Sequence, residues 1–163
     1  MVYSDISKEL NDIIKRFFDA KAALFEKAVT AIEEKLKTGH KILVFGNGGS
    51  AAEAQHFAAE LVNRFARTRK PLRAIALTTD TSILTSISND YGYADCFAKQ
   101  VKALGREGDV AIGISTSGAA PNVIKAMKVA REMGLKTVGL AGGDGGQLAK
   151  LVDIPLIVDA ESV

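Results

Sequence analysis

The chain has 163 residues, the usual size of one domain, so it can bury one sizeable core. Its 47% hydrophobic and 25% charged residues are ordinary for a globular protein, and a net charge of +2 is too small to indicate a nucleic acid as partner. A single cysteine, Cys96, excludes an internal disulfide framework. Because no Cys/His signature accompanies it, we expect a core or interface residue rather than a nucleophile.

The sequence shows no targeting or membrane-spanning pattern. Residues 1–10 include Asp5, Lys8 and Glu9 and lack the apolar centre of a secretory signal. No stretch approaches the roughly 20 consecutive apolar residues that cross a bilayer. We therefore expect a cytoplasmic protein with neither a membrane nor a nucleic acid as partner.

Helical periodicity marks the first 39 residues. Apolar residues recur every three or four positions over residues 6–18, and a second such run over residues 24–36 stops at Gly39, a typical residue for a helix C-terminus. The sequence thus predicts two N-terminal helices. Their apolar faces are wide for the edge of a monomer, and we expect them to form an oligomer interface.

From residue 40 onward, short apolar runs alternate with helical stretches. The predicted strands are residues 42–45, 72–77, 110–114, 137–141 and 154–158. The predicted helices are residues 51–66, 82–87, 94–104, 122–133 and 147–151. Uninterrupted apolar runs are typical of strands buried on both faces, and their alternation with helices is typical of a parallel sheet.

We predict an α/β fold with a doubly wound, mostly parallel five-stranded sheet of the flavodoxin-like kind. Residues 1–163 are expected to form a single domain, with the N-terminal helices in 1–39 and the α/β core in 40–158. Ligands of such sheets bind outside the carboxyl ends of the strands.

The first loop at that edge has the sequence GNGGS, residues 46–50, and leads from the first strand directly into a helix. Its glycines let the backbone approach a ligand, and the helix N-terminus offers free N–H groups. The segment also fits a dinucleotide fingerprint, but that requires an acidic residue near the end of the second strand, and residues 61–79 contain none. A tight turn without any ligand is the remaining alternative for this loop alone.

The second loop is Ser115-Thr116-Ser117-Gly118, which follows a buried strand and precedes a helix with Pro121 in its first turn. Three consecutive hydroxyls at a helix N-terminus suit a phosphate dianion. An ordinary helix cap explains one hydroxyl but not three. In contrast, residues 142–146, GGDGG, offer no hydroxyl, and we predict a flexible turn there.

Several blocks in order along nearly the whole chain resemble the sugar isomerase (SIS) domain family, and most closely its phosphoheptose isomerases. These blocks are GNGGS (46–50), QHFAAEL (55–61), SNDYG (88–92), GREGDV (105–110) and GISTSG (113–118). The resemblance implies a homotetramer that converts sedoheptulose 7-phosphate into D-glycero-D-manno-heptose 7-phosphate. That product is used for ADP-heptose, and so for the lipopolysaccharide core or other surface glycans.

The resemblance also implies roles for individual residues. His56 and Glu60 match family zinc ligands, and Glu60 also matches a catalytic acid/base. The residues expected to bind the sugar phosphate are Asn47, Gly48, Gly49, Ser50, Asn89, Asp90, Ser115, Thr116 and Ser117.

The spacing of His56 and Glu60 is compatible with these roles. At i and i+4 on a helix they share one face. An aldose–ketose conversion needs a group that moves a proton between two adjacent carbons, and a carboxylate can do so. The alternative is an exposed His–Glu pair that stabilises the helix by a few tenths of a kcal/mol.

The chain departs from the family pattern in two places. Family members have a serine at the position of Ala120, and the alanine in this chain lacks the hydroxyl for one expected phosphate contact. They also continue into a C-terminal helix whose glutamine and histidine complete the zinc site, and we expect the native chain to continue past Val163 in this way. His40, the other histidine, precedes the first strand at the wrong end of the sheet.

Two other functions stay open at the level of sequence. One is a non-enzymatic tetrameric adaptor that binds the replication-initiator protein and resembles this chain around residues 55–59, but lacks the carboxylate found here at Glu60. The other is a phosphosugar-sensing module, which would keep the Ser-Thr-Ser loop and need no base.

Overall fold

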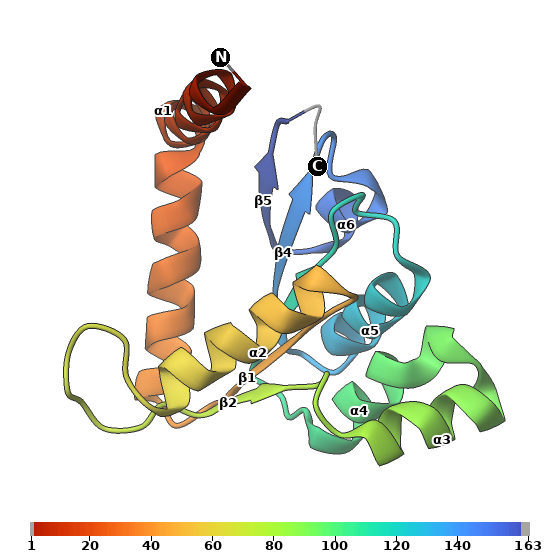
Figure 1. The fold of residues 1–163 in the computed structure, drawn as a ribbon. Coiled ribbons are helices and arrows are strands. Elements are labelled where there is room, and N and C mark those ends of the chain that lie inside the picture. Colours follow the sequence, from red (N-terminus) through yellow and green to blue (C-terminus); the bar gives the residue numbers. More distant parts are fainter. Residues whose placement is uncertain (1, 161–163) are drawn as a thin grey trace.

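Five short strands form one fully parallel sheet in the computed structural model, which describes residues 2–160 (Figure 1). They are β1 (Ile42–Gly46), β2 (Ala74–Ala76), β3 (Val110–Ile114), β4 (Lys136–Gly142) and β5 (Ile154–Val158). Their order is β2-β1-β3-β4-β5, so the direction of winding reverses between β1 and β3. This order confirms the predicted doubly wound, flavodoxin-like α/β sheet.

Helices cover both faces of the sheet (Figure 1). They are α1 (Val2–Lys37), α2 (Gly49–Val62), α3 (Thr81–Tyr91), the 3-10 turn η1 (Tyr93–Asp95), α4 (Cys96–Leu104), α5 (Pro121–Glu132) and α6 (Gly146–Leu151). None of the helices within residues 2–160 is both long and apolar enough to cross a membrane.

Alternating side chains of β1 explain why the strands are apolar throughout. Leu43 and Phe45 belong to the core beneath α4, α5 and α6, whereas Ile42 and Val44 belong to the core beneath α1 and α2. Successive residues of a strand point to opposite faces, so a strand buried on both sides needs an uninterrupted apolar run. Cys96 is fully buried in the first of these cores, as expected for a core residue.

The N-terminal prediction was wrong in one respect, because residues 2–37 form one continuous helix of 36 residues rather than two. The segment between the two predicted runs, residues 19–23, is DAKAA. Alanine and lysine favour a helix, and no glycine or proline interrupts the chain there. A Lys15–Asp19 ion pair spaced i, i+4 also spans the join.

The second strand is shorter than predicted, and α2 ends at Val62 rather than near residue 66. The backbone N–H of Leu72 donates to the carbonyl of Leu61 instead of to a neighbouring strand. The Arg69 guanidinium donates to the carbonyls of Glu60 and Leu61, each at 2.7 Å. These bonds satisfy the C-terminal carbonyls of α2, which explains why the helix stops there.

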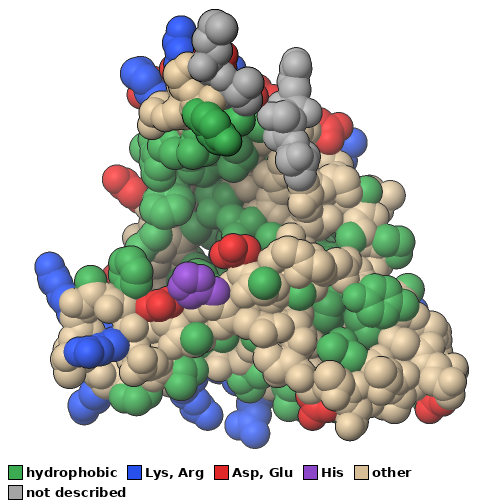
Figure 2. Space-filling model, viewed as in Figure 1, with side chains coloured by type: hydrophobic (Ala, Val, Ile, Leu, Met, Phe, Trp, Pro, Cys, Tyr) green, Lys and Arg blue, Asp and Glu red, His purple; other side chains and the backbone are tan. Residues whose placement is uncertain are grey.

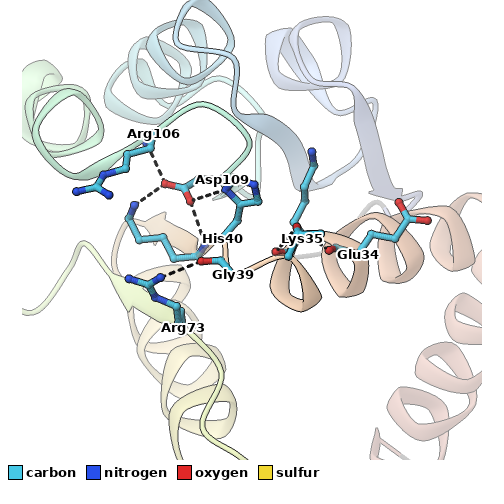
Figure 3. A network of polar contacts seen from close by, with 9 residues as sticks. Glu34, Lys35, Gly39, His40, Arg73, Arg106 and Asp109 are labelled. Atoms are coloured by element: carbon cyan, nitrogen blue, oxygen red, sulfur yellow. Dashed lines mark hydrogen bonds and ion pairs between the residues drawn. The ribbon is translucent and has the colours of Figure 1, made fainter.

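A polar network around Asp109 closes the amino edge of the sheet (Figure 3). This carboxylate is 2% exposed and accepts hydrogen bonds from the backbone N–H of Lys41 at 3.0 Å and of Arg106 at 2.9 Å, as well as from the Lys41 ammonium. His40 Nδ1 lies 3.6 Å from the same carboxylate. His40 is therefore at the edge opposite the strands' carboxyl ends, as the sequence predicted.

Candidate functional site

A cavity of about 560 Å³ lies at the carboxyl edge of the sheet. Asn47 and Ser50 line it from the loop after β1, and residues 115–117 line it from the loop after β3. The two loops are side by side because β1 and β3 are parallel neighbours, with Gly46 paired to Ile114 at their ends. The structure thus brings five of the predicted sugar-phosphate residues to one pocket: Asn47, Ser50, Ser115, Thr116 and Ser117.

The loop after β3 is folded by its own hydrogen bonds. The backbone N–H of Gly118 donates to the Ser115 carbonyl at 2.9 Å, and the Ser115 and Ser117 hydroxyl oxygens accept from the N–H groups of Ala120 and Ala119, each at 3.4 Å. Both hydroxyls keep their own proton to donate. The N-cap residue of α5, Ala120, has no side chain that could cap the helix, and the N–H of Val123 in the first turn donates to Asn122 Oδ1 at 3.0 Å. The hydroxyls and the helix terminus together form a set of donors for an anion.

Residues 142–146 form the predicted turn between β4 and α6, but hydrogen bonds hold this turn against the loop after β3. The N–H of Gly142 donates to the Thr116 carbonyl at 2.8 Å, and the N–H of Leu148 donates to the Gly118 carbonyl at 2.9 Å. The two loops approach so closely that a Cβ on Gly118 would lie 2.0 Å from the Gly145 carbonyl oxygen. Glycines here permit backbone contact between the loops rather than flexibility.

The loop after β1 opens directly into α2. Gly48 has φ of +54° at the N-cap of this helix, and no side chain caps it. Gly46, at the end of β1, has no room for a side chain, because a Cβ there would lie 2.8 Å from the Ile114 carbonyl oxygen. Gly46 therefore lets the ends of β1 and β3 come close, and Gly48 and Gly49 leave the N–H groups of α2 uncovered.

Asn47 belongs to a side-chain network that the sequence analysis did not find. Its amide exchanges two hydrogen bonds with the amide of Asn122, at 2.9 and 2.8 Å, and its Oδ1 also accepts from the Tyr93 hydroxyl at 3.0 Å. Asn122 is 2% exposed, in the first turn of α5. Because Asn47 and Asn122 are 75 residues apart, no local pattern in the sequence indicated that their amides pair.

His56 and Glu60 lie on one face of α2, as predicted. Their Nε2 and Oε1 atoms are 3.4 Å apart, and their side chains are 65% and 35% exposed. The second carboxylate oxygen of Glu60, Oε2, is buried and has no hydrogen-bond partner among residues 2–160. Such an oxygen is suited to accept a proton or to bind a cation.

Glu60 does not line the 560 Å³ cavity of its own chain. It follows Ser50 by ten residues of helix, which is about 15 Å along the axis of α2. A sugar ester held by residues 115–117 must therefore extend along α2 to meet this carboxylate, or meet the same carboxylate of a neighbouring subunit.

Asn89 and Asp90 do not line the cavity either. They lie exposed near the end of α3, where the Asn89 amide donates to the Asp90 carboxylate at 2.9 Å. Their predicted contact with a sugar would also require an extended ligand or a second subunit.

A zinc ion fits His56 and Glu60 only in part. An imidazole nitrogen and a carboxylate with a buried, unpartnered oxygen are suitable donors. Among residues 2–160, however, no group of three or more His, Cys, Asp or Glu side chains is arranged to hold a metal. Because protein zinc sites usually have three or four protein ligands, these two residues can supply only part of a set.

Helix α1 presents a long apolar face that remains exposed. Figure 2 shows hydrophobic side chains gathered over this helix, above a hollow in the surface. A cavity of about 350 Å³ lined by Phe17 and Phe25 separates α1 from the ends of β4 and β5. The exposed apolar residues of α1 are Tyr3, Ile6, Leu10, Ile14, Phe18, Phe25 and Val29.

Comparison with known proteins agrees with this fold. The model of the SIS domain matches residues 7–142. A phosphoheptose isomerase of Aliarcobacter butzleri is 60% identical over 133 residues, 82% of this chain and 70% of that protein. One of Helicobacter pylori is 48% identical over 99% of this chain and 85% of its own length. The structure of a phosphoheptose isomerase from Francisella tularensis has a TM-score of 0.93 at 37% identity, over 99% of this chain and 86% of that one. The chain therefore belongs to the SIS domain family, in the branch of the phosphoheptose isomerases.

Proposed function

We propose that this isomerase converts sedoheptulose 7-phosphate into D-glycero-D-manno-heptose 7-phosphate, the step that leads to ADP-heptose for the lipopolysaccharide core or other surface glycans. The observation that carries the proposal is the 560 Å³ cavity, where the loops after β1 and β3 meet at the N-termini of α2 and α5. The names of the relatives support a phosphorylated heptose as the ligand.

The phosphate is proposed to bind the hydroxyls of Ser115, Thr116 and Ser117 at the N-terminal end of α5. Hydrogen bonds to a phosphate are strengthened by its charge, and the helix dipole favours an anion at this end. Asn47, Gly48, Gly49 and Ser50 then contact the sugar, together with the exposed pair on α3, Asn89 and Asp90.

Glu60 is the proposed acid/base. Its carboxylate takes a proton from C1 of the ketose, which leaves an enediolate, and returns a proton to C2, while the hydroxyl proton moves from O1 to O2. The ketone at C2 thereby becomes a hydroxyl and C1 becomes an aldehyde, with no other atom gained or lost. The free Oε2 atom is available for this transfer.

His56 and Glu60 are proposed to hold zinc together with ligands from outside residues 2–160. Bound zinc supplies stabilisation of negative charge on the substrate oxygens.

The exposed apolar face of α1 supports the homotetramer, because a helix face of this kind is stabilised by burial against other copies. Substituting Phe18 by Glu on this face should shift the sedimenting species to a smaller one, and an unchanged species would contradict the role of α1.

Proton exchange in deuterated water tests the role of Glu60. The Glu60→Gln variant should bind sedoheptulose 7-phosphate but incorporate no deuterium, whereas the control Glu34→Gln, at the far end of α1, should exchange as the unmodified protein does. Undiminished exchange in Glu60→Gln would remove Glu60 from the mechanism. Binding without exchange in the unmodified protein would favour a phosphosugar-sensing module.

Elemental analysis tests the metal site without an activity measurement. His56→Ala should lose zinc, and His40→Ala, at the opposite edge of the sheet, should retain it. Equal zinc content in both variants would contradict the assignment of His56.

A further inference from the structure

We infer that Asn122 and Tyr93 are positioning residues that turn the Asn47 amide into a pure hydrogen-bond donor toward the sugar. The inference rests on the proposed function, because it concerns the same pocket. Asn47 lines the cavity, while Asn122 and Tyr93 do not and act on the ligand through Asn47.

The orientation of the Asn122 amide is fixed by a backbone donor. The N–H of Val123 donates to Asn122 Oδ1 at 3.0 Å, and an N–H can be paired only with the oxygen of the amide. The Asn122 Nδ2 atom therefore points the other way, where it donates to Asn47 Oδ1 at 2.8 Å and lies 3.5 Å from the Cys96 sulfur. Asn122 is 2% exposed, so water does not compete for these bonds.

The fixed amide of Asn122 determines the orientation of the Asn47 amide in turn. Asn47 Nδ2 donates to Asn122 Oδ1 at 2.9 Å, and this bond requires the nitrogen of Asn47 on that side. Asn47 Oδ1 then accepts two hydrogen bonds, one from Asn122 and one from the Tyr93 hydroxyl at 3.0 Å. Both lone pairs of this oxygen are occupied.

One N–H of Asn47 is left over, and it is the only hydrogen-bonding group of this side chain that the network does not use. Because Asn47 lines the cavity, its ligand partner must be an acceptor: a hydroxyl, carbonyl or phosphate oxygen. An ammonium at the same position would find no acceptor on Asn47. At this contact the network therefore favours a sugar phosphate with an oxygen atom over one with an ammonium group.

Tyr93 provides a clean perturbation, because the residue is 57% exposed and contributes little to the core. Tyr93→Phe frees one lone pair of Asn47 Oδ1, so that Asn122 alone holds the amide and the amide is no longer a pure donor. We expect kcat/KM for the phosphorylated ketose to fall about fivefold, mainly through KM, which is the effect of one hydrogen bond. The control Tyr3→Phe removes a hydroxyl from a residue that is 89% exposed on α1 and should change nothing.

A double-mutant cycle separates positioning from a structural role. If Tyr93 acts through Asn47, Tyr93→Phe should have no further effect on kcat/KM in an Asn47→Ala background, where kcat/KM is already at least tenfold lower. Additive losses in the double variant, or an unchanged kcat/KM in Tyr93→Phe alone, would overturn the inference. In either case, turnover by the unmodified protein would still uphold the proposed function. If the unmodified protein neither binds nor turns over phosphorylated ketoses, the proposed function and this inference both fall.

Discussion

Gly118 should be the most sensitive backbone position in the pocket. It has φ of +62°, which costs an alanine about 1 kcal/mol, and an added Cβ would lie 2.0 Å from the Gly145 carbonyl oxygen. One loop must move by roughly 1 Å to reach a tolerable contact, which breaks the bonds from Leu148 to Gly118 and from Gly142 to Thr116. At about 1 kcal/mol for each bond, Gly118→Ala should destabilise the fold by about 3 kcal/mol in all.

Gly39→Ala is the matched control. Gly39 has φ of +85° but open space around its Cβ position, and it lies at the amino edge of the sheet, away from the pocket. Gly39→Ala should lower the free energy of unfolding only by the cost of a positive φ for alanine, about 1 kcal/mol. Thermal denaturation should show a Tm lowered by about 6–12 °C for Gly118→Ala and about 2–4 °C for Gly39→Ala. Calorimetry should show at least about tenfold weaker binding of a phosphorylated ketose only for Gly118→Ala. Equal Tm shifts, or unchanged affinity in Gly118→Ala, would refute the supporting role of residues 142–146.

Two further predictions concern stability. Burial alone would raise the pKa of Asp109, but hydrogen bonds from Lys41 and Arg106 outweigh it and hold the pKa below the usual 3.8. Because the pKa of Asp109 is lower in the folded state, its ionised carboxylate stabilises the fold above the unfolded-state pKa, and this stability is lost as the pH falls through the folded-state pKa. Urea denaturation should therefore show a free energy of unfolding that falls below about pH 4, and falls less steeply with pH in Asp109→Asn. An equal pH dependence in both proteins would contradict this. Ala120→Ser places a hydroxyl at the N-cap of α5 and should raise Tm by about 2–4 °C, and a lower Tm would show that the hydroxyl points elsewhere.

Local patterns were sufficient to predict most of the sheet. The strands at residues 110–114 and 154–158 match the prediction at both ends, because each is a complete apolar run buried on both faces. The edge strand β2 was overestimated at its start, because Leu72 bonds back to α2, whereas Arg73 and Leu77 bond to β1 on either side of Ala74–Ala76. Composition cannot distinguish an apolar segment that pairs from one that only packs.

The pocket was predictable where its residues follow strands directly, and not where it depends on contacts between loops. Ser115–Ser117 and Asn47 were found because parallel strands bring the loops that follow them to one edge. The contact of Gly118 with Gly145 and the pairing of Asn47 with Asn122 join segments 27 and 75 residues apart. Such contacts depend on tertiary packing, so a single sequence carries no local signal for them.

We propose that this chain isomerises a phosphorylated ketoheptose by moving a proton between C1 and C2. Proton NMR of sedoheptulose 7-phosphate in deuterated water, with the purified protein, tests it most directly. We predict the appearance of aldose signals with deuterium at C2, along with loss of signal from a C1 proton of the ketose. A spectrum that stays identical to that of the sugar without protein would contradict the account.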